Sequence, residues 1–360
     1  MRLAKFEVID HRRRRLLGTA TVSLAVAGLG LTMSSNVEAL AAPKAPSFAG
    51  ATGWLNTAPL AAADLRGKVV LIDFWTFDCV NCRNALPYVR AWAEKYKDQG
   101  LVVIGVHTPE FTFEQDVDNV RRAAAAMNVT YPIALDSRYD VWNAFANRYW
   151  PALYFIDANG RIRDQQFGEG EYEQSERVIQ DLLAEAGQAG VDRSLVSVAP
   201  RGAEVAADWS SLKSPENYIG YAKSEGFASF GGFREDVPSR YRTASTLPRN
   251  GWGLTGVWTA GREFAAPSEA SGRITYRFHA RDVNLVLAPP AQGRAIRFRV
   301  KLDGAAPGAH HGVDVDADGF GTVHDGRLYQ LIRQTGAIAD RTFEIEFHDP
   351  DVRAYAFTFG

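Results

Sequence analysis

Two cysteines are the residues of this sequence whose type and spacing could carry out redox chemistry. The 360-residue chain contains only Cys79 and Cys82, with Val80 and Asn81 between them. Thiol-disulfide exchange needs one thiolate that attacks and a second thiol close enough to resolve the mixed disulfide. Two cysteines are too few for a disulfide framework or for a four-ligand zinc site. We therefore predict a redox-active Cys79–Cys82 disulfide, no other cofactor and no bound metal.

The pattern around the cysteines predicts that they lie at the start of a helix. Residues 68–75 form a short apolar run typical of a buried strand, and residues 82–99 repeat apolar side chains at helical spacing. A sulfur in the first turn of a helix faces unpaired N–H groups and the positive end of the helix dipole, which lower the pKa of a thiol. We expect Cys79 to attack and Cys82, one turn deeper, to be buried and to resolve.

Five further segments extend this unit into an α/β domain. They are a strand at 101–107, a helix at 113–127, a short strand at 131–135, a hairpin at 152–167 and a helix at 172–186. A strand, a crossover helix and a second strand form a βαβ unit, and an Asn-Gly turn between two apolar runs favours a hairpin. This order predicts a central mixed sheet flanked by helices over residues 53–190.

The cysteine segment resembles the thioredoxin family. Asp73 and Trp75 match the strand that carries the family's buried aspartate, the two cysteines match its redox pair, and Pro87 matches its helix-kinking proline. The resemblance implies that Asp73 assists proton transfer to and from the resolving thiol. The alternative for Asp73 is a strand-end carboxylate that caps the next element, although burying a carboxylate without a task is costly.

The dipeptide Trp150-Pro151 lies just before the first hairpin strand, where the thioredoxin family has its cis-proline loop. The resemblance implies that Pro151 is cis and that Trp150 presents backbone groups to the substrate chain. The alternative is an ordinary trans proline in a turn. Trp75, Val80 and Asn81, beside the cysteines, complete the expected substrate-binding set.

Other residues near the pair depart from the family pattern or stay ambiguous. Val80-Asn81 stands in place of Gly-Pro, and Asp78 replaces the usual aromatic residue. A negative neighbour disfavours the thiolate, whereas an extra N–H stabilises it, so the sequence predicts no direction of electron flow. His107 and Glu110 begin a segment that resembles the insertion of TlpA-type thioredoxins; they could tune protons at the site, but a solvated loop is the favoured interpretation.

Residues 214–360 carry period-two apolar patterns that predict an all-β sandwich after a polar linker at 191–213. The predicted strands are 273–279, 283–287, 296–302, 342–347 and 355–359. Together the two domains resemble the soluble part of DipZ-type proteins, in which a thioredoxin-like domain precedes a jelly-roll sandwich like a carbohydrate-binding module.

The predicted sandwich offers two candidate binding features, and core packing or turn formation explains both. The aromatic residues that could stack on sugar rings are Trp209, Tyr218, Tyr221, Trp252 and Trp258. Buried aromatics commonly fill such cores, so carbohydrate binding is the less favoured interpretation. Residues 314–325 have the acidic spacing of a calcium loop, but alternation over 311–315 and an Asp-Gly turn favour a hairpin without metal.

Residues 1–41 have the pattern of an export signal. Four arginines, Arg12 to Arg15, precede a moderately apolar run over 16–33, and small residues near position 41 suit a signal peptidase. The paired arginines resemble a twin-arginine signal; a Sec signal or an uncleaved membrane anchor is the alternative. We therefore expect a periplasmic or other extracytoplasmic location, with residues 42–52 as a linker to the first domain.

These patterns predict an exported oxidoreductase that exchanges disulfides with extracytoplasmic proteins. The net charge of -2 and the pI near 6.4 provide no strong field for nucleic acid. DipZ-type proteins carry a membrane electron-transfer domain for which this sequence has no counterpart. The resemblance leaves two alternatives open: electrons reach Cys79 from a separate membrane donor of the CcdA or DsbD type, or the protein acts as an oxidant.

Three alternative functions stay open. A thiol peroxidase is suggested by Thr76 three residues before Cys79, but Ile72 stands where such enzymes need proline. Copper delivery is suggested by the paired cysteines, but copper chaperones of this fold space them by three residues. The third alternative is a sugar-binding module with a vestigial redox domain.

Overall fold

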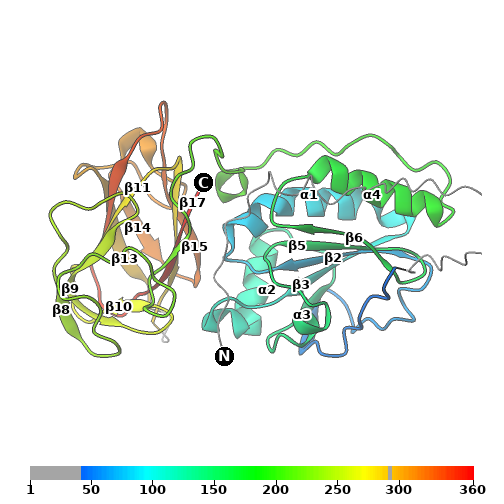
Figure 1. Ribbon diagram of the computed structural model, residues 1–360, viewed down its shortest axis with the longest axis horizontal. Coiled ribbons are helices and arrows are strands. Elements are labelled where there is room, and N and C mark those ends of the chain that lie inside the picture. Colours follow the sequence, from blue (N-terminus) through cyan, green and yellow to red (C-terminus); the bar gives the residue numbers. More distant parts are fainter. Residues whose placement is uncertain (1–41, 291–293) are drawn as a thin grey trace, which may run out of the picture. The chain divides into compact units, whose positions relative to one another are not determined.

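The computed structural model of the protein describes residues 42–290 and 294–360 (Figure 1). The predicted export signal, residues 1–41, lies outside the described residues. Within those residues, no helix combines the length and the apolar character needed to cross a bilayer. The fold comprises a mixed sheet with helices, followed by a large all-β region.

The first sheet has six strands in the order β1-β4-β3-β2-β5-β6. The strands are β1 (Gly53–Leu55), β2 (Val69–Trp75), β3 (Leu101–His107), β4 (Ile133–Leu135), β5 (Ala152–Ile156) and β6 (Ile162–Phe167). Strands β2, β3 and β4 run parallel, and β5 pairs antiparallel with β2. The predicted mixed sheet is confirmed. All seven residues of β2 are buried, because the strand lies between β3 and β5 and both its faces are covered.

Helices cover both faces of this sheet. They are α1 (Val80–Tyr96), α2 (Val117–Ala126), α3 (Asp140–Ala144) and α4 (Tyr172–Glu185). Figure 1 shows α1 and α4 on one side of the sheet and α3 on the other. The side chains agree: α1, α2 and α4 share one apolar core with the odd-numbered residues of β2, and α3 shares another with the even-numbered ones.

The helix predicted at 113–127 is interrupted. A 3-10 helix spans Thr112–Gln115, and α2 begins only at Val117. Between them Asp116 adopts an extended backbone, and its carboxylate accepts hydrogen bonds from the N–H groups of Asp118 and Asn119. An aspartate satisfies N–H groups better as a cap than inside a helix, so the chain restarts its helix there.

The segment 42–52, predicted as a linker, packs against the first domain. The Ala45 N–H donates to the Gly160 carbonyl at 2.9 Å, and Lys44 forms a β-bridge with Arg161. Phe48 is buried, and its ring lies edge-on to Trp54 with centroids 5.6 Å apart. Burial of the apolar Phe48 side chain therefore helps to hold this segment on the core of the first domain.

The all-β region is one large sheet whose two halves share β9. Its strands are β7 (Asn217–Tyr218), β8 (Ser239–Tyr241), β9 (Trp252–Ala260), β10 (Ala265–Pro267), β11 (Gly272–Phe278), β12 (Asp282–Ala288), β13 (Ile296–Leu302), β14 (Phe320–Val323), β15 (Arg327–Arg333), β16 (Arg341–Phe347) and β17 (Arg353–Phe359). The start of β9 pairs with β11 and its end pairs with β8 and β10. Gly256, with φ of 104°, lies between these two parts of the strand. Both halves contribute to one apolar core, as expected for a sandwich.

The two binding features suggested for the sandwich have structural roles. Trp252 and Trp258 are fully buried, as the favoured interpretation of core packing predicts, so these two rings are not available to stack on sugar. The Asp314 carboxylate is occupied by the Gln330 N–H at 2.8 Å and the Arg327 guanidinium at 2.7 Å. Within the described residues, no group of three or more His, Cys, Asp or Glu side chains is arranged to hold a metal ion. The Asp-Gly turn forms before β14, but residues 311–315 make no regular strand.

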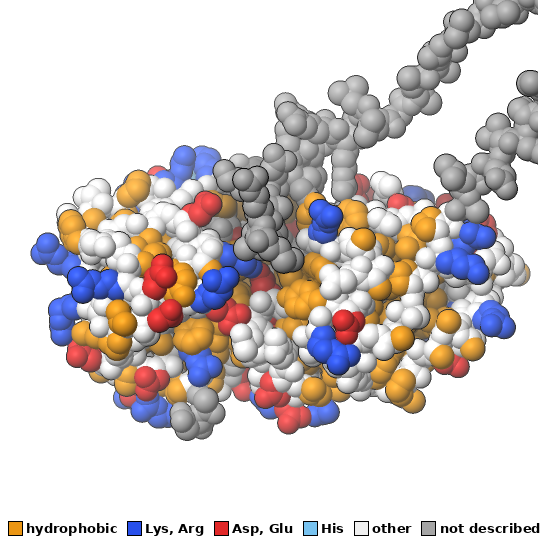
Figure 2. All heavy atoms as spheres, turned by 60° about the horizontal axis from the view of Figure 1, so that its bottom comes forward, with side chains coloured by type: hydrophobic (Ala, Val, Ile, Leu, Met, Phe, Trp, Pro, Cys, Tyr) orange, Lys and Arg blue, Asp and Glu red, His pale blue; other side chains and the backbone are white. Residues whose placement is uncertain are grey.

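The segment 191–213 contacts both domains. Glu204, in the 3-10 helix Gly202–Glu204, forms an ion pair with Arg90 of α1 at 2.8 Å. The Gly202 carbonyl accepts from Arg333 of β15 at 3.1 Å. Figure 2 shows basic and acidic side chains interspersed over the visible face, in keeping with the net charge of -2.

The β-domain core provides a test of the fold with a matched control. Phe298 on β13 is fully buried, whereas Phe320 on the adjacent β14 is 45% exposed. We expect Phe298→Ala to lower the free energy of unfolding by about 3–5 kcal/mol, because it leaves a cavity. Phe320→Ala should change it by less than about 1 kcal/mol. Urea denaturation of both variants checks this, and equal losses would contradict the assigned core.

Candidate active site

The cysteines lie at the N-terminus of α1, as predicted. Cys79 is the N-cap residue, with extended backbone angles of φ -73° and ψ 117°. Its sulfur accepts a hydrogen bond from the Cys82 backbone N–H at 3.3 Å. Both cysteines are free thiols; Cys79 is half-exposed, and Cys82 is buried at 5% exposure. One sulfur can therefore meet an external disulfide while the other stays behind it.

The environment keeps Cys82 in its thiol form. Burial raises the pKa of Cys82 well above its ordinary value, and the Cys79 sulfur and the Asp73 charge raise it further. A thiol with a high pKa is a poor nucleophile until a base removes its proton. The geometry thus separates an accessible thiol from one that needs a proton acceptor.

Asp73 is placed to be that acceptor. It lies in the middle of β2 at 3% exposure. The neighbouring odd-numbered residues of β2 face the core shared with α1, so Asp73 points toward the helix that carries Cys82. Burial raises the pKa of Asp73 to about 7, and the Tyr131 hydroxyl opposes this rise. The carboxyl group can therefore take up or release a proton near neutral pH.

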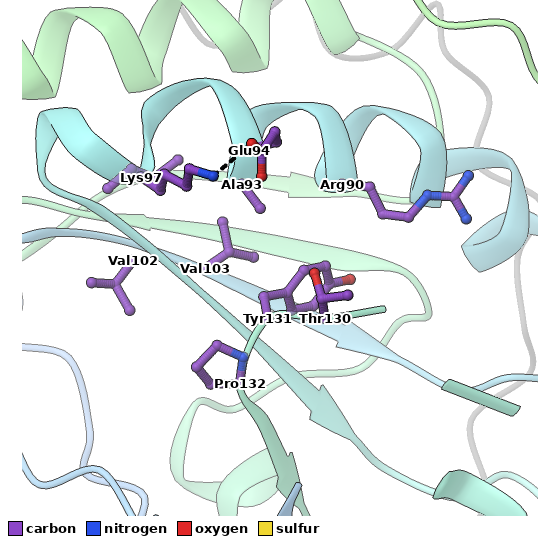
Figure 3. Close-up of a pocket in the computed structure, with 10 residues that line it drawn as sticks. Arg90, Ala93, Glu94, Lys97, Val102, Val103, Thr130, Tyr131 and Pro132 are labelled. Atoms are coloured by element: carbon purple, nitrogen blue, oxygen red, sulfur yellow. Dashed lines mark hydrogen bonds and ion pairs between the residues drawn. The ribbon is translucent and has the colours of Figure 1, made fainter. Parts of the chain in front are cut away.

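Tyr131 is a residue of this site that the sequence did not reveal. Its hydroxyl, whose interaction with Asp73 opposes the rise in pKa, and Asp73 Oδ1 are both buried, and neither has another hydrogen-bond partner among the described residues. Tyr131 also lines a cavity of about 290 Å³ between α1, β3 and the segment before β4 (Figure 3). A Cβ on Gly105 would lie 2.8 Å from Trp75 Nε1 and 3.2 Å from the Tyr131 ring, so glycine leaves room for both side chains. No sequence spacing predicts that Tyr131 lies at this site, because Asp73 and Gly105, which it approaches, are distant from it in the sequence.

The cis form of the Trp150-Pro151 peptide bond is confirmed. The Trp150 indole N–H donates to the Thr108 carbonyl at 3.1 Å, and its ring lies 4.3 Å from that of Trp142. Trp150 itself is half-exposed, whereas Pro151 is buried. These contacts fix the orientation of the loop.

The remaining predicted substrate contacts differ in exposure. Val80 and Asn81 are half-exposed at the start of α1. Trp75 is only 2% exposed and lies edge-on to His107, with ring centroids 5.4 Å apart. Trp75 therefore supports the site from within the core and does not face a substrate.

The prediction of a solvated loop at His107 and Glu110 is wrong. His107 is 2% exposed and stacks on Phe77 with centroids 5.4 Å apart. Burial lowers the pKa of His107 to about 3, so the ring is neutral at physiological pH. The Glu110 side chain is 11% exposed and accepts a hydrogen bond from the Tyr218 hydroxyl. His107 is enclosed by Trp75 and Phe77, whereas Glu110 is partly buried and contacts Tyr218 of the second domain.

Asp78, next to Cys79, is also buried, at 2% exposure. Burial raises the pKa of Asp78 to about 7, and the Arg83 guanidinium opposes the rise. A full negative charge beside Cys79 is therefore present only above neutral pH. The repulsion that the sequence predicts between the Asp78 carboxylate and a thiolate is therefore weaker at and below neutral pH.

A buried carboxyl group, Glu114, connects the loops around the cysteines, and the sequence analysis missed it. The Thr76 hydroxyl donates to Glu114 Oε1, and the N–H groups of Glu110 and Phe111 donate to Oε2. Burial raises the pKa of Glu114 well above its ordinary value. The Thr76 hydroxyl, which suggested a peroxidase, is thus already bound to a carboxyl group.

Comparison with known proteins agrees with this geometry. Residues 42–165 match the AhpC/TSA family, and residues 214–360 match the family described as thioredoxin-like C-terminal domain. Thiol-disulfide oxidoreductase YkuV of Bacillus subtilis is 34% identical over 140 residues, which are 39% of this chain and 94% of that protein.

Two further similarities cover different shares of the chain. Protein DipZ of Mycobacterium tuberculosis is 40% identical over 252 residues, 68% of this chain and 35% of DipZ, so the chain spans about a third of that relative. A solved structure described as a putative thiol:disulfide interchange protein DsbE, from Chlorobium tepidum, is 26% identical with a TM-score of 0.36, covering 39% of this chain and 96% of that one. The chain belongs to the thioredoxin superfamily and carries a thioredoxin-like C-terminal domain after its redox fold.

Proposed function

We propose that the protein is a thiol-disulfide oxidoreductase that exchanges disulfides with exported proteins through Cys79 and Cys82. The observation that carries the proposal is the half-exposed N-cap sulfur of Cys79, with the buried Cys82 thiol one turn behind it. The similarity to a named thiol-disulfide oxidoreductase over 94% of that protein's length supports the same chemistry.

The exchange proceeds in two displacements. The Cys79 thiolate attacks a substrate disulfide, forms a mixed disulfide and displaces one substrate sulfur as a thiolate, which takes a proton. Cys82 then loses its proton and attacks the Cys79 sulfur, which forms the Cys79–Cys82 disulfide and releases the second substrate thiolate. Two electrons pass from the pair to the substrate, and the reverse sequence oxidises a substrate dithiol.

Asp73 is the proposed acceptor of the Cys82 proton. With a pKa of about 7, Asp73 is ionised in a useful fraction of molecules at neutral pH. Its negative charge is near enough to raise the pKa of Cys82. Trp150 and Pro151, together with Val80 and Asn81, are the proposed substrate contacts.

The proposal also covers where the protein acts and which partner supplies its electrons. Export through a twin-arginine signal rests on Arg12 to Arg15 and the apolar run that follows them. The similarity to DipZ supports an extracytoplasmic site of action. A separate membrane electron donor of the CcdA or DsbD type is a further part of the proposal. Fractionation of cells that produce the full chain, with Arg14→Lys and Arg15→Lys variants, tests the export step.

Insulin reduction tests the redox assignment. We expect the purified protein to accelerate the reduction of insulin disulfides by dithiothreitol, and Cys79→Ser to abolish the acceleration because no attacking thiolate remains. Cys82→Ser should instead accumulate a mixed disulfide, detected by mass spectrometry as a protein–insulin adduct. Undiminished activity in Cys79→Ser would refute the assignment, and hydroperoxide turnover or copper binding would favour the alternatives.

The buried carboxyl group predicts a pH-dependent stability. Asp73 has a folded pKa of about 7, above its ordinary value of 3.8, so its contribution to stability is greatest below about pH 4 and is lost as the pH rises through 7. Asp73→Asn removes this penalty. At pH 8 it should raise the free energy of unfolding by about 2–4 kcal/mol, and the gain should vanish near pH 4.

Denaturation at both pH values measures this effect, with Asp98→Asn as the control because Asp98 is exposed. The exchange rate of Asp73→Asn should also fall by about tenfold or more, because the base is lost. A variant that loses stability at pH 8, or keeps its full rate, would contradict the role given to Asp73.

A further inference from the structure

The loop after β6 is bonded to the cis-proline loop of the redox site. Phe167, the last residue of β6, pairs with Ala152, and the Gly168 N–H donates to the Pro151 carbonyl at 2.9 Å. Glu169 is the next residue of this loop. Its side chain therefore starts beside the peptide bond at which the substrate chain is proposed to dock.

The same loop is bonded to the helix that carries the cysteines. Asn84 lies on α1 two residues after Cys82, and its Nδ2 donates to Glu169 Oε1 at 3.1 Å. Glu169 is thus held from two sides, by its neighbour's bond to the cis-proline loop and by its own bond to α1. Both of these elements border the proposed substrate site.

The backbone on both sides of Glu169 leaves open space. Gly168 and Gly170 have φ of 79° and 96°, values that favour glycine. A Cβ on either glycine would meet no residue within 4 Å other than its chain neighbours. Glu169 itself is half-buried. A side chain of a bound polypeptide can therefore approach this carboxyl group.

The Glu169 carboxyl group lacks a positive partner. In the part of the chain that the structure describes, Asn84 is the only side chain that forms a hydrogen bond with it, and no basic residue forms an ion pair with it. Asn84 is 3% exposed, and its Oδ1 is also without a partner there. This oxygen belongs to the same planar amide as the nitrogen that binds Glu169. Two acceptor groups are therefore adjacent, and the site is short of donors.

Burial makes this shortage unfavourable for the free protein. It raises the pKa of Glu169 to about 7, and the Asn84 amide opposes the rise. A guanidinium or ammonium group would favour the carboxylate and supply N–H donors at the same time. The exposed side chains of Glu171 and Glu173 add negative charge at the approach. The chemistry of the site thus suits a cation.

We propose that Glu169, supported by Asn84, is a specificity-determining residue that binds an arginine or lysine side chain a few residues from the substrate cysteine that Cys79 attacks. The inference rests on the proposed function. The cis-proline loop would align the substrate backbone, and Glu169 would select the charge of one side chain. An acidic side chain at the same position would be repelled, so the site discriminates in both directions.

Peptides that differ in one residue test this preference. Each has a single cysteine in a mixed disulfide with thionitrobenzoate, and arginine, glutamine or glutamate at one of the positions flanking the cysteine. Cys79 of the reduced full chain attacks the peptide sulfur, the peptide disulfide breaks, and thionitrobenzoate leaves as a coloured thiolate; Cys82 then displaces the peptide thiolate. At about pH 8, where Glu169 is ionised, the rate constant for the best arginine peptide should exceed that of its glutamine counterpart by about fivefold to twentyfold.

Three variants attribute the preference to Glu169. Glu169→Gln keeps an acceptor for Asn84 and removes only the charge, so the ratio of the two rate constants should fall to about two or less. Glu169→Lys should reverse the preference, with the glutamate peptide reacting faster than the arginine peptide. Glu171→Gln removes an exposed charge from the same loop and should keep the preference for arginine.

Equal rate constants for the arginine and glutamine peptides at every position would overturn the inference and leave the proposed function intact. An equal loss of preference in Glu171→Gln would also overturn it, because the effect would then come from the general charge of the loop. Affinity for fluorescent peptides with serine in place of cysteine, measured by polarisation, needs no exchange and should follow the same order. If no peptide released thionitrobenzoate, the proposed function would fail, and the order of affinities would still decide the role of Glu169.

Discussion

The hydrogen bond from the Cys82 N–H to the Cys79 sulfur is the interaction on which the rest of the site depends. It requires Cys79 to be the N-cap of α1, and the strand β2 to end only four residues earlier. The fully buried β2 and the helix packed on it fix that geometry. Once the cap is set, one sulfur reaches the surface and the other is enclosed, and this asymmetry separates attack from resolution.

Burial of ionisable groups is the second constraint, because it decides which charges the cysteines experience. Asp73, Asp78 and Glu114 are each at most 3% exposed, and desolvation raises the pKa of all three. A fully ionised set would oppose a thiolate at Cys79, whereas protonated carboxyl groups do not. The site therefore gains negative charge as the pH rises through neutrality.

The sequence predicted the elements whose signals are local, and it missed contacts made between distant segments. β2, β3 and the hairpin β5–β6 follow from apolar runs and an Asn-Gly turn, and Asp73, the cysteines and the cis Pro151 follow from the family pattern. Tyr131 lies near Asp73, and Glu114 binds the Thr76 hydroxyl; both pairs join residues tens of positions apart, which no periodicity encodes. Trp75 and His107 end strands that the sequence predicts, but we expected Trp75 to contact the substrate and His107 to begin a solvated loop. Both side chains are enclosed, because a position at the end of a strand does not show which residues will cover it.

The interface between the domains is apolar and buried, like the core of a single domain. Phe111, Leu328 and Tyr355 are each at most 4% exposed, and they come from both domains. A first domain without its partner would expose Phe111 and part of Phe113 and Val80 beside the attacking thiol, a patch of the kind that soluble proteins cover.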